Sequence, residues 1–313
     1  MKIIFFGSSD FSIPVLKALL ASPHHVIHVI TTPDKKRGRG QKLASTVVKE
    51  FALKHNLPVS NPEKLSDPSV VTAIQKLMPD LLVIASYGKL IPSSIFTVPK
   101  IAALNVHPSL LPKYQGASPI QQALLNGDKQ TGVSIAEIIK KLDAGDVFGQ
   151  VKTDIGENEN ALELSERLSE MAAELLLKVI QQFETGNVSR TPQMTSESVY
   201  AGKFEKEFGE INWQKPVLQI HNQVRACYPW PSAFTFFHGK RLKICKARPA
   251  QTDSQAVEPG TILEITLTGE IHVQTMPGIL ELIQVQLEGG REISSSEFVR
   301  GQHIQKGERF ESS

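Results

Sequence analysis

The first half of the chain alternates between short apolar runs and amphipathic segments. Continuous apolar runs, which predict strands buried on both faces, lie at residues 2–6, 26–30, 81–85 and 101–106. Apolar residues at helical spacing predict helices over residues 11–20, 46–55 and 70–77. Because strands alternate with helices, the pattern predicts a doubly wound, mostly parallel α/β domain of Rossmann-like type.

The pattern changes after a long amphipathic helix predicted over residues 158–183. Residues 190–208 are polar without periodicity and predict a linker between a domain at 1–189 and a domain at 209–313. Short runs separated by glycine-containing turns predict strands at 233–237, 241–247, 261–266, 270–274 and 278–286. This spacing favours a small OB-like β-barrel, although a β-sandwich would show the same pattern.

The candidate chemistry begins at the end of the strand predicted over residues 101–106. Asn105 and His107 are two residues apart, so an extended segment points both side chains to one side. The ends of parallel strands are where ligands bind in such sheets. Asp143, in a later Leu-Asp-Ala-Gly-Asp turn, supplies a carboxylate. Together an amide, an imidazole and a carboxylate form a general acid–base set, although each residue alone is more often a cap or a turn former.

Asp146 is the competing carboxylate in that turn, and a role in capping the turn is the alternative we favour for it.

The composition excludes several classes of protein but does not identify one. Apolar content of 41% and charged content of 21% are ordinary for a globular protein, and the net charge of +2 does not decide for or against nucleic acid. The basic surplus is local, with nine Lys and Arg against four Asp and Glu in residues 191–250.

The two cysteines indicate neither a disulfide framework nor a zinc cluster. The chain lacks a dinucleotide fingerprint, a phosphate loop and paired metal-ligand spacing, so we expect no metal and no nicotinamide. With no signal peptide and no long apolar run, we expect a soluble, cytoplasmic monomer without membrane contact.

Several longer motifs allow the chain to be compared with a known protein family. They are Ser86-Tyr-Gly-Lys-Leu-Ile-Pro92, Asn105-Val-His-Pro-Ser-Leu-Leu-Pro112, Tyr114-Gln-Gly-Ala-Ser-Pro-Ile120, Leu142-Asp-Ala-Gly-Asp146, Tyr200-Ala-Gly-Lys203 and Arg225-Ala-Cys-Tyr-Pro-Trp-Pro231. Over nearly the whole chain this ensemble resembles the methionyl-tRNA formyltransferase family. The resemblance implies transfer of a formyl group from 10-formyltetrahydrofolate, a folate co-substrate, to the α-amino group of initiator methionyl-tRNA.

The resemblance also implies roles for individual residues. Asn105 would donate its amide to the developing oxyanion, His107 would contact the same oxygen or move the proton, and Asp143 would hydrogen-bond His107. The implied folate-binding residues are Ser109, Leu110, Leu111 and Pro112 as a rigid wall, with the backbone of Ser86, Tyr87 and Gly88 at the pterin edge. The leaving nitrogen is attached to an aryl ring and is already stabilised, so no metal is needed.

Two basic segments are candidate tRNA contacts. The first contains Lys35, Lys36, Arg37, Arg39 and Lys42 beside two glycines. Composition alone favours a solvated, mobile loop, whereas the resemblance implies a loop that enters the acceptor arm with Arg39 as the matching arginine. Substitution of Arg39 by Ala should then raise KM for tRNA and leave folate binding nearly intact.

The second segment contains Lys240, Arg241, Lys243 and Lys246, whose alternation indicates a strand with one basic face. Such a face could protect an exposed sheet edge, but beside a small barrel it favours contact with the tRNA backbone.

One departure and three alternatives stay open at this point. Relatives often have Arg at the position of Gln115, so a charged contact there is in doubt, and Lys113 is the candidate substitute. The Asn, His and Asp set is shared with sugar-nucleotide N-formyltransferases and with formyltetrahydrofolate hydrolases, so these residues indicate the reaction class and leave the acceptor open. A non-catalytic RNA-binding protein on the same fold is the third alternative, and the intact set argues against it.

Overall fold

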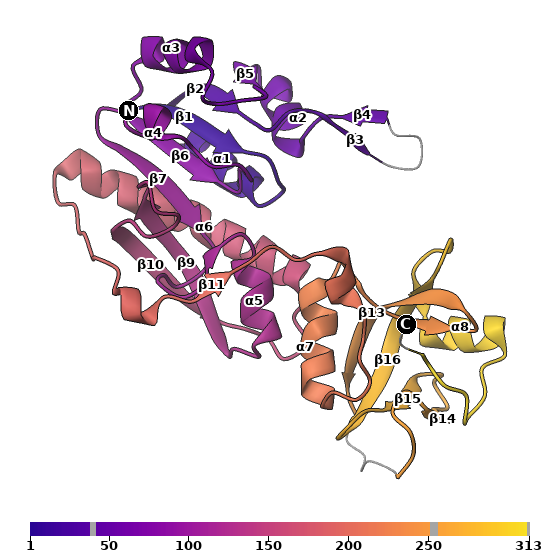
Figure 1. The fold of residues 1–313 in the computed structure, drawn as a ribbon. Coiled ribbons are helices and arrows are strands. Elements are labelled where there is room, and N and C mark those ends of the chain that lie inside the picture. Colours follow the sequence, from indigo (N-terminus) through magenta and orange to yellow (C-terminus); the bar gives the residue numbers. More distant parts are fainter. Residues whose placement is uncertain (38–41, 251–255, 312–313) are drawn as a thin grey trace. The chain divides into compact units, whose positions relative to one another are not determined.

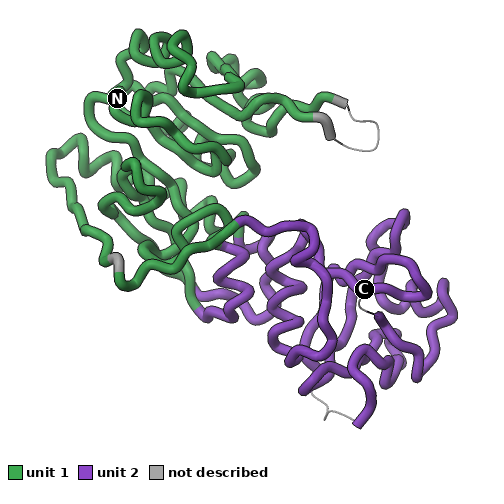
Figure 2. The backbone as a smooth tube through the Cα atoms, in the orientation of Figure 1, with its two compact units in different colours: residues 1–119, 130–153, 165–202 green, residues 120–129, 154–164, 203–313 purple. Residues whose placement is uncertain are grey.

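The computed structural model describes residues 1–37, 42–250 and 256–311. The chain divides into two compact units, each described separately below (Figure 2). Unit 1 comprises residues 1–119, 130–153 and 165–202, and unit 2 comprises residues 120–129, 154–164 and 203–313. None of the helices in the described ranges is both long enough and apolar enough to cross a membrane.

A seven-stranded sheet forms the centre of unit 1 (Figure 1). In spatial order its strands are β10 (Val147–Asp154), β9 (Gln130–Glu137), β7 (Ala102–His107), β6 (Leu81–Ala85), β1 (Lys2–Gly7), β2 (His25–Ile30) and β5 (Val59–Ser60). The five strands from β7 to β5 run parallel, and β9 runs antiparallel to β7. The predicted doubly wound, mostly parallel sheet is therefore confirmed.

Helices cover the sheet of unit 1, and the burial of its inner strand β1 explains the apolar runs. The helices of unit 1 in the first half of the chain are α1 (Ser12–Ala21), α2 (Val47–Lys54), α3 (Pro68–Leu77) and α4 (Ser93–Phe96), whereas α5 (Pro119–Leu125) belongs to unit 2 apart from its first residue. Ile4 and Phe6 of β1 pack in one core with Ile74 of α3 and Ile95 of α4. The intervening residue, Phe5, is equally buried, so β1 is covered on both faces and needs apolar residues at every position.

The long helix predicted over residues 158–183 is α6, observed as Ala161–Thr185. The polar stretch expected as a linker begins as part of unit 1. Thr191 forms a bridge with Val147, and β11 (Tyr200–Ala201) pairs in parallel with β8 (Gln115–Gly116). Two short 3-10 helices, at Thr195–Glu197 and Lys206–Gly209, complete this region.

Unit 2 is built on an antiparallel sheet (Figure 1). Its strands in spatial order are β12 (Ala233–Phe237), β13 (Lys240–Pro249), β16 (Ile279–Leu287), β15 (Ile271–Gln274) and β14 (Ile262–Ile265), and β17 (Ile293–Ser294) pairs with β16. The end of the chain joins the two edges, because Glu311 bridges Phe236 of β12 and Arg309 bridges Thr261 beside β14. The sheet therefore closes, as the small predicted barrel requires.

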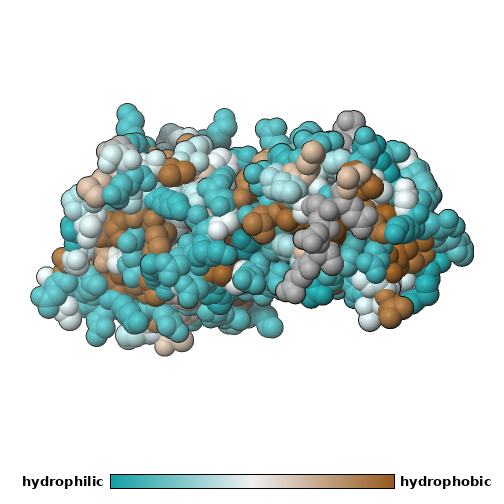
Figure 3. Space-filling view, turned by 90° about the horizontal axis from the view of Figure 1, so that it is seen from below, coloured by the Kyte–Doolittle hydropathy of each residue, from teal (hydrophilic) through white to brown (hydrophobic). Residues whose placement is uncertain are grey.

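Two helices belong to this barrel. Helix α7 (Val217–Cys227) was not anticipated from the sequence and packs against β13 and β16, and α8 (Ser295–Gln302) packs against β16. The core includes Trp213, Ile220, Phe237 and Phe310. Outside the cores, the face drawn in Figure 3 is largely hydrophilic, with apolar residues in small separate patches.

Candidate active site

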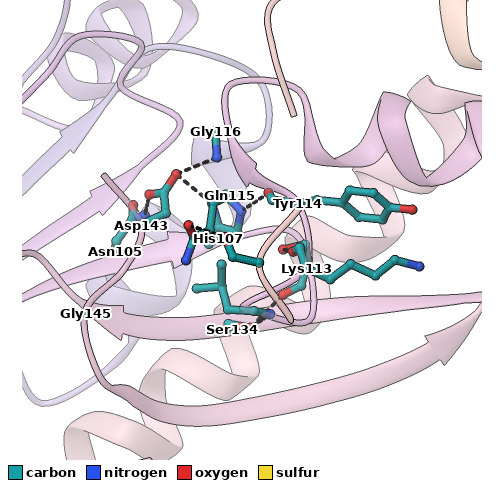
Figure 4. A network of polar contacts seen from close by, with 12 residues as sticks. Asn105, His107, Lys113, Tyr114, Gln115, Gly116, Ser134, Asp143 and Gly145 are labelled. Atoms are coloured by element: carbon teal, nitrogen blue, oxygen red, sulfur yellow. Dashed lines mark hydrogen bonds and ion pairs between the residues drawn. The ribbon is translucent and has the colours of Figure 1, made fainter. Parts of the chain in front are cut away.

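Asn105, His107 and Asp143 meet at the end of strand β7 (Figure 4). The Asn105 amide donates to Oδ1 of Asp143 at 2.8 Å, and Oδ2 of Asp143 lies 3.9 Å from Nδ1 of His107. The side chains of His107 and Asp143 are only 5% and 8% exposed. Within unit 1, Asp143 therefore contacts each of the two other residues that the sequence analysis placed in one set.

The carboxylate contacts His107 less closely than expected. We predicted a hydrogen bond between them, but 3.9 Å is too long for one, and the short contacts of Asp143 go to Asn105 and Gly116. Nε2 of His107 lies 2.9 Å from the carbonyl oxygen of Tyr114. Because a carbonyl oxygen can only accept, this contact assigns a hydrogen to Nε2 and leaves Nδ1 facing the carboxylate.

The backbone holds Asp143 in an unusual conformation. Its φ is 50°, in the left-handed region that favours glycine, and Oδ2 accepts a hydrogen bond from the Gly116 N–H at 2.9 Å. Gly145 must be glycine, because a Cβ there would lie 2.0 Å from the Glu137 carbonyl oxygen. The backbone carbonyl of Asp146 accepts a hydrogen bond from the Glu137 N–H. Of the two carboxylates in the turn, Asp143 is the one in contact with Asn105 and His107.

The predicted folate wall, Ser109 to Pro112, is a tightly bonded turn. Ser109 is fully buried and donates to the Lys113 carbonyl. Ser134 of β9 donates to the Ser109 carbonyl and accepts from Leu111 N. Gln150 of β10 donates to both the Leu111 carbonyl and Ser134 Oγ. The wall is therefore rigid because two neighbouring strands clamp it, a feature that the wall's own residues do not reveal.

Ser86, Tyr87 and Gly88 line a cavity of about 270 Å³ at the carboxyl ends of β1, β2 and β6. The other lining residues are Ser8, Ser9, Thr32, Pro33, Lys35, Ala44 and Thr46. Ser8 and Ser9 hydrogen-bond to the Tyr87 carbonyl and to Ser86, which joins the ends of β1 and β6. The Asn105, His107 and Asp143 side chains and residues 109–112 are not among the lining residues.

The cavity lies next to the end of β7 in the register of the sheet. Ala85 of β6 pairs with Val106 of β7, so Ser86 and His107 follow side by side. The Tyr87 ring packs edge-on against Phe6, and burial raises the pKa of its phenol to about 12.

The described residues of the first basic segment form a hairpin. Strands β3 (Lys35–Arg37) and β4 (Lys42–Ala44) pair antiparallel and extend from unit 1 in Figure 1. The hairpin base is fixed by an ion pair between Asp34 and Lys49 at 2.7 Å. Lys35 is exposed and lines the cavity. Arg39 lies outside the described residues, as do the side chains of Lys36, Arg37 and Lys42.

The second basic segment is strand β13, as predicted, but a bulge changes its pattern. Register shifts at Lys246 bury both Ile244 and Cys245, so the outward positions change from odd to even numbers. The Arg241 guanidinium lies 3.4 Å from the Phe234 ring centroid. Lys240 and Lys246 are exposed and Lys243 is half-buried, and none of these lysines has an ion-pair partner among the described residues. Arg248, farther along, is paired with Glu281.

Buried polar groups in unit 2 serve the fold. Arg225 donates to Asn222 and to the carbonyls of Gly156 and Leu124. Burial and the nearby Arg225 lower the pKa of His221 to about 4. Cys227 and Cys245 are free, and burial raises the pKa of each thiol to about 12. Trp230 of the same motif is 56% exposed.

Sequence reasoning missed the residues that support the site. Gln115 is buried, donates to Gln193 and accepts from Ser198, so its amide is already used within unit 1. Lys113, the candidate substitute for a charge, points away from the network toward the Tyr114 ring (Figure 4). Gln193 lies in a polar stretch that carries no periodicity or motif signal. Within the described ranges, no three His, Cys, Asp or Glu side chains are grouped so that they could hold a metal.

A doubly wound sheet that holds an amide, an imidazole and a carboxylate near the end of a strand is typical of α/β enzymes that use general acid–base chemistry. The formyl transferase family profile matches residues 1–180, and the profile for the formyl transferase C-terminal domain matches residues 203–303. The chain is 43% identical to a methionyl-tRNA formyltransferase of Sulfurihydrogenibium sp. over 99% of this chain and 100% of the relative. It is 40% identical to that of Alkaliphilus oremlandii over 98% of both chains. The chain therefore belongs to the formyl transferase family, and within it to the methionyl-tRNA formyltransferases.

Solved structures agree on the fold. A methionyl-tRNA formyltransferase from Clostridium thermocellum matches with a TM-score of 0.55 and 18% identity, over 80% of this chain and 94% of that chain. WlaRD, a sugar 3N-formyl transferase, matches with a TM-score of 0.66 and 20% identity, over 93% and 99% of the two chains. At such identities these structures support the fold and leave the acceptor open.

Proposed function

We propose that this chain transfers a formyl group from 10-formyltetrahydrofolate to the α-amino group of methionine on initiator tRNA. The observation that carries the proposal is the contact among Asn105, His107 and Asp143 at the end of β7, in a chain with full-length similarity to methionyl-tRNA formyltransferases. The names of those relatives support methionyl-tRNA as the acceptor. One structural neighbour was solved in complex with tetrahydrofolic acid and another with folinic acid, which supports a folate donor.

The chemistry joins the amine nitrogen to the formyl carbon and breaks the bond from that carbon to N10 of the folate. Negative charge develops on the formyl oxygen as the amine attacks. One N–H of the Asn105 amide is held by Asp143, which aims the other N–H at that oxygen. Removal of such a preorganised donor costs about 3–4 kcal/mol in the transition state.

A proton must also move from the attacking amine to N10. Nε2 of His107 donates to the Tyr114 carbonyl, so Nδ1 is the atom that takes the proton. The Asp143 carboxylate at 3.9 Å stabilises the imidazolium that forms, and the proton then passes to the leaving nitrogen. Ser86, Tyr87, Gly88 and the wall from Ser109 to Pro112 hold the folate, and no metal takes part.

Cations on both units hold the tRNA backbone. The proposed contacts are Lys35, Lys36, Arg37, Arg39 and Lys42 on the first segment and Lys240, Arg241, Lys243 and Lys246 on β13. Exposed lysines without ion partners suit phosphates, which position an RNA without reading its sequence. We also propose that the chain acts as a cytoplasmic monomer, and a solution mass near 34.5 kDa is the expected result.

The test is to incubate the purified protein with 10-formyltetrahydrofolate and either initiator or elongator methionyl-tRNA. We expect formylmethionine on the initiator tRNA. Consumption of the donor without transfer to either tRNA would favour a hydrolase. Transfer to an amino-sugar nucleotide alone would favour the sugar-acceptor alternative.

A further inference from the structure

The Asp143 turn is held by a second residue that lies far away in the sequence. The Gln193 amide nitrogen donates to the carbonyl oxygen of Asp143 at 2.8 Å and to that of Gly145 at 2.7 Å. Both hydrogens of this NH₂ group are therefore used on the turn that carries the carboxylate. A non-glycine residue with a φ of 50° persists where its surroundings hold it, and these two bonds do so on the backbone side.

The orientation of the Gln193 amide follows from its partners. Carbonyl oxygens only accept, so the nitrogen must face the turn and the Gln193 oxygen must face a donor. That donor is the Gln115 amide nitrogen at 2.8 Å, and the Gln115 oxygen accepts in turn from the Ser198 hydroxyl at 2.8 Å. The polarity of the whole chain of bonds is thereby determined.

Strand β8, which contains Gln115, also holds the Asp143 carboxylate. Gly116, the neighbour of Gln115 in β8, donates its N–H to Oδ2 of Asp143, and β8 is fixed by pairing with Tyr200 and Ala201. One support therefore fixes the backbone of Asp143, and the other fixes its side chain. Both depend on residues 193–201, in the stretch that the sequence pattern predicted as a linker.

We propose that Gln193 is a positioning residue for formyl transfer, oriented by Gln115, which holds Asp143 at its working distance from Asn105 and His107. This inference rests on the proposed function of Asp143. In this chain Gln115 therefore acts as a buried amide donor rather than as a substitute for a charged group.

The test is Gln193→Glu, which keeps the size of the side chain, removes both donors and sets a carboxylate against two carbonyls. We expect kcat to fall about tenfold or more, because small misplacements of catalytic groups are costly, while KM for folate and for tRNA changes less than about twofold. Gln115→Glu should lower kcat in the same direction, because it removes the donor that orients Gln193.

Gln223→Glu is the matched control. Gln223 likewise donates its amide to two backbone carbonyls, those of Phe208 and Glu210, but both partners belong to unit 2, whereas the Asp143 turn belongs to unit 1. We expect its kcat to stay within about twofold of the unchanged chain.

A double-mutant cycle separates positioning from general damage. In an Asp143→Asn background, Gln193→Glu should lower kcat by a much smaller factor than it does in the unchanged chain, because the carboxylate that it positions is gone. An equal factor in both backgrounds, or a kcat within about threefold of the unchanged chain, would overturn the inference.

Hydrogen exchange gives a readout that does not depend on activity. Gln193→Glu should accelerate exchange of the amides in residues 141–147, and Gln223→Glu should not. Unchanged protection of that turn would overturn the inference even if the chain transferred no formyl group. Absence of transfer by the unchanged chain together with accelerated exchange would instead count against the proposed function alone.

Discussion

The end of β7 in unit 1 and the strand β13 in unit 2 both carry polar candidate residues, but they hold them in different ways. At β7 the side chains of His107 and Asp143 are buried and Asn105 is half-buried, and each is bonded to another functional or supporting group. On β13 the lysines have no ion-pair partner among the described residues, and each stands alone.

From this contrast we expect substitutions to behave differently in the two regions. In the buried network the effects of two changes should depend on each other, because each group orients the next. On the strand the effects should be small, independent of each other and sensitive to salt, because exposed charges interact with the RNA one phosphate at a time.

The strongest test of the comparison is Asp143→Asn. The variant keeps the shape but loses the charge that stabilises the imidazolium, so kcat should fall about a hundredfold or more, and both KM values should change little. Steady-state kinetics with each substrate varied would measure this. An unchanged kcat would remove Asp143 from the site and would undo the contrast between the regions.

The buried His221 of unit 2 should make the stability depend on pH. The folded pKa of His221 is about 4 and its ordinary value is 6.5, so the unfolded chain binds more protons between these values. Stability is therefore fully present above pH 6.5 and falls as the pH drops toward 4, by about 2 kcal/mol between pH 7 and pH 5.

Urea unfolding followed by tryptophan fluorescence measures this, since Trp213 and Trp230 both lie in unit 2. His221→Gln should flatten the dependence. The same slope in the variant would show that another group titrates.

Gly116→Ala tests the support of the carboxylate. A Cβ at Gly116 would lie 2.4 Å from the Ala201 carbonyl oxygen, with φ at 120°, so β8 must shift and take its N–H away from Asp143. We expect a kcat loss of about tenfold and a lower stability of about 2 kcal/mol.

The matched control is Gly186→Ala, which has a φ of 71° but no atom within 4 Å. It should show the backbone strain without the loss of kcat. Equal kinetics in the two variants would mean that the clash at β8 does not reach the site.

The smallest effects should come from β13. Substituting Ala for Lys240, Lys243 or Lys246 should raise KM for tRNA about threefold each, multiply in combination, and reduce the salt slope of binding by about one per lysine. Fluorescence anisotropy across salt concentrations measures the slope.

Arg248→Ala is the contrast, because it leaves the nearly buried Glu281 without its bidentate partner and should lower the stability of unit 2 instead. Strong coupling among the lysines would contradict the comparison.

Much of this fold could be predicted because its signals are local. The apolar runs of β1 and β6 indicate strands covered on both faces, and Asn105 and His107 share a face through the two-residue period of a strand. Helix α7 was missed because several of its buried positions are polar, namely His221, Gln223 and Arg225, so its apolar periodicity is weak. The phase change in β13 was missed because a bulge depends on the partner strand.

Local sequence patterns were sufficient to predict most of the longer helices and strands, the family and the residue types of the candidate site. The packing of the chain was needed to show which atoms meet. Asp143 bonds Asn105 and Gly116 more closely than His107, Gln150 clamps the predicted folate wall, and Gln193 reaches back to the Asp143 turn. The reason is physical. Hydrophobic periodicity records burial along one element, whereas a hydrogen bond between residues 143 and 193 depends on the distance and direction between two segments brought together by the packing of unit 1.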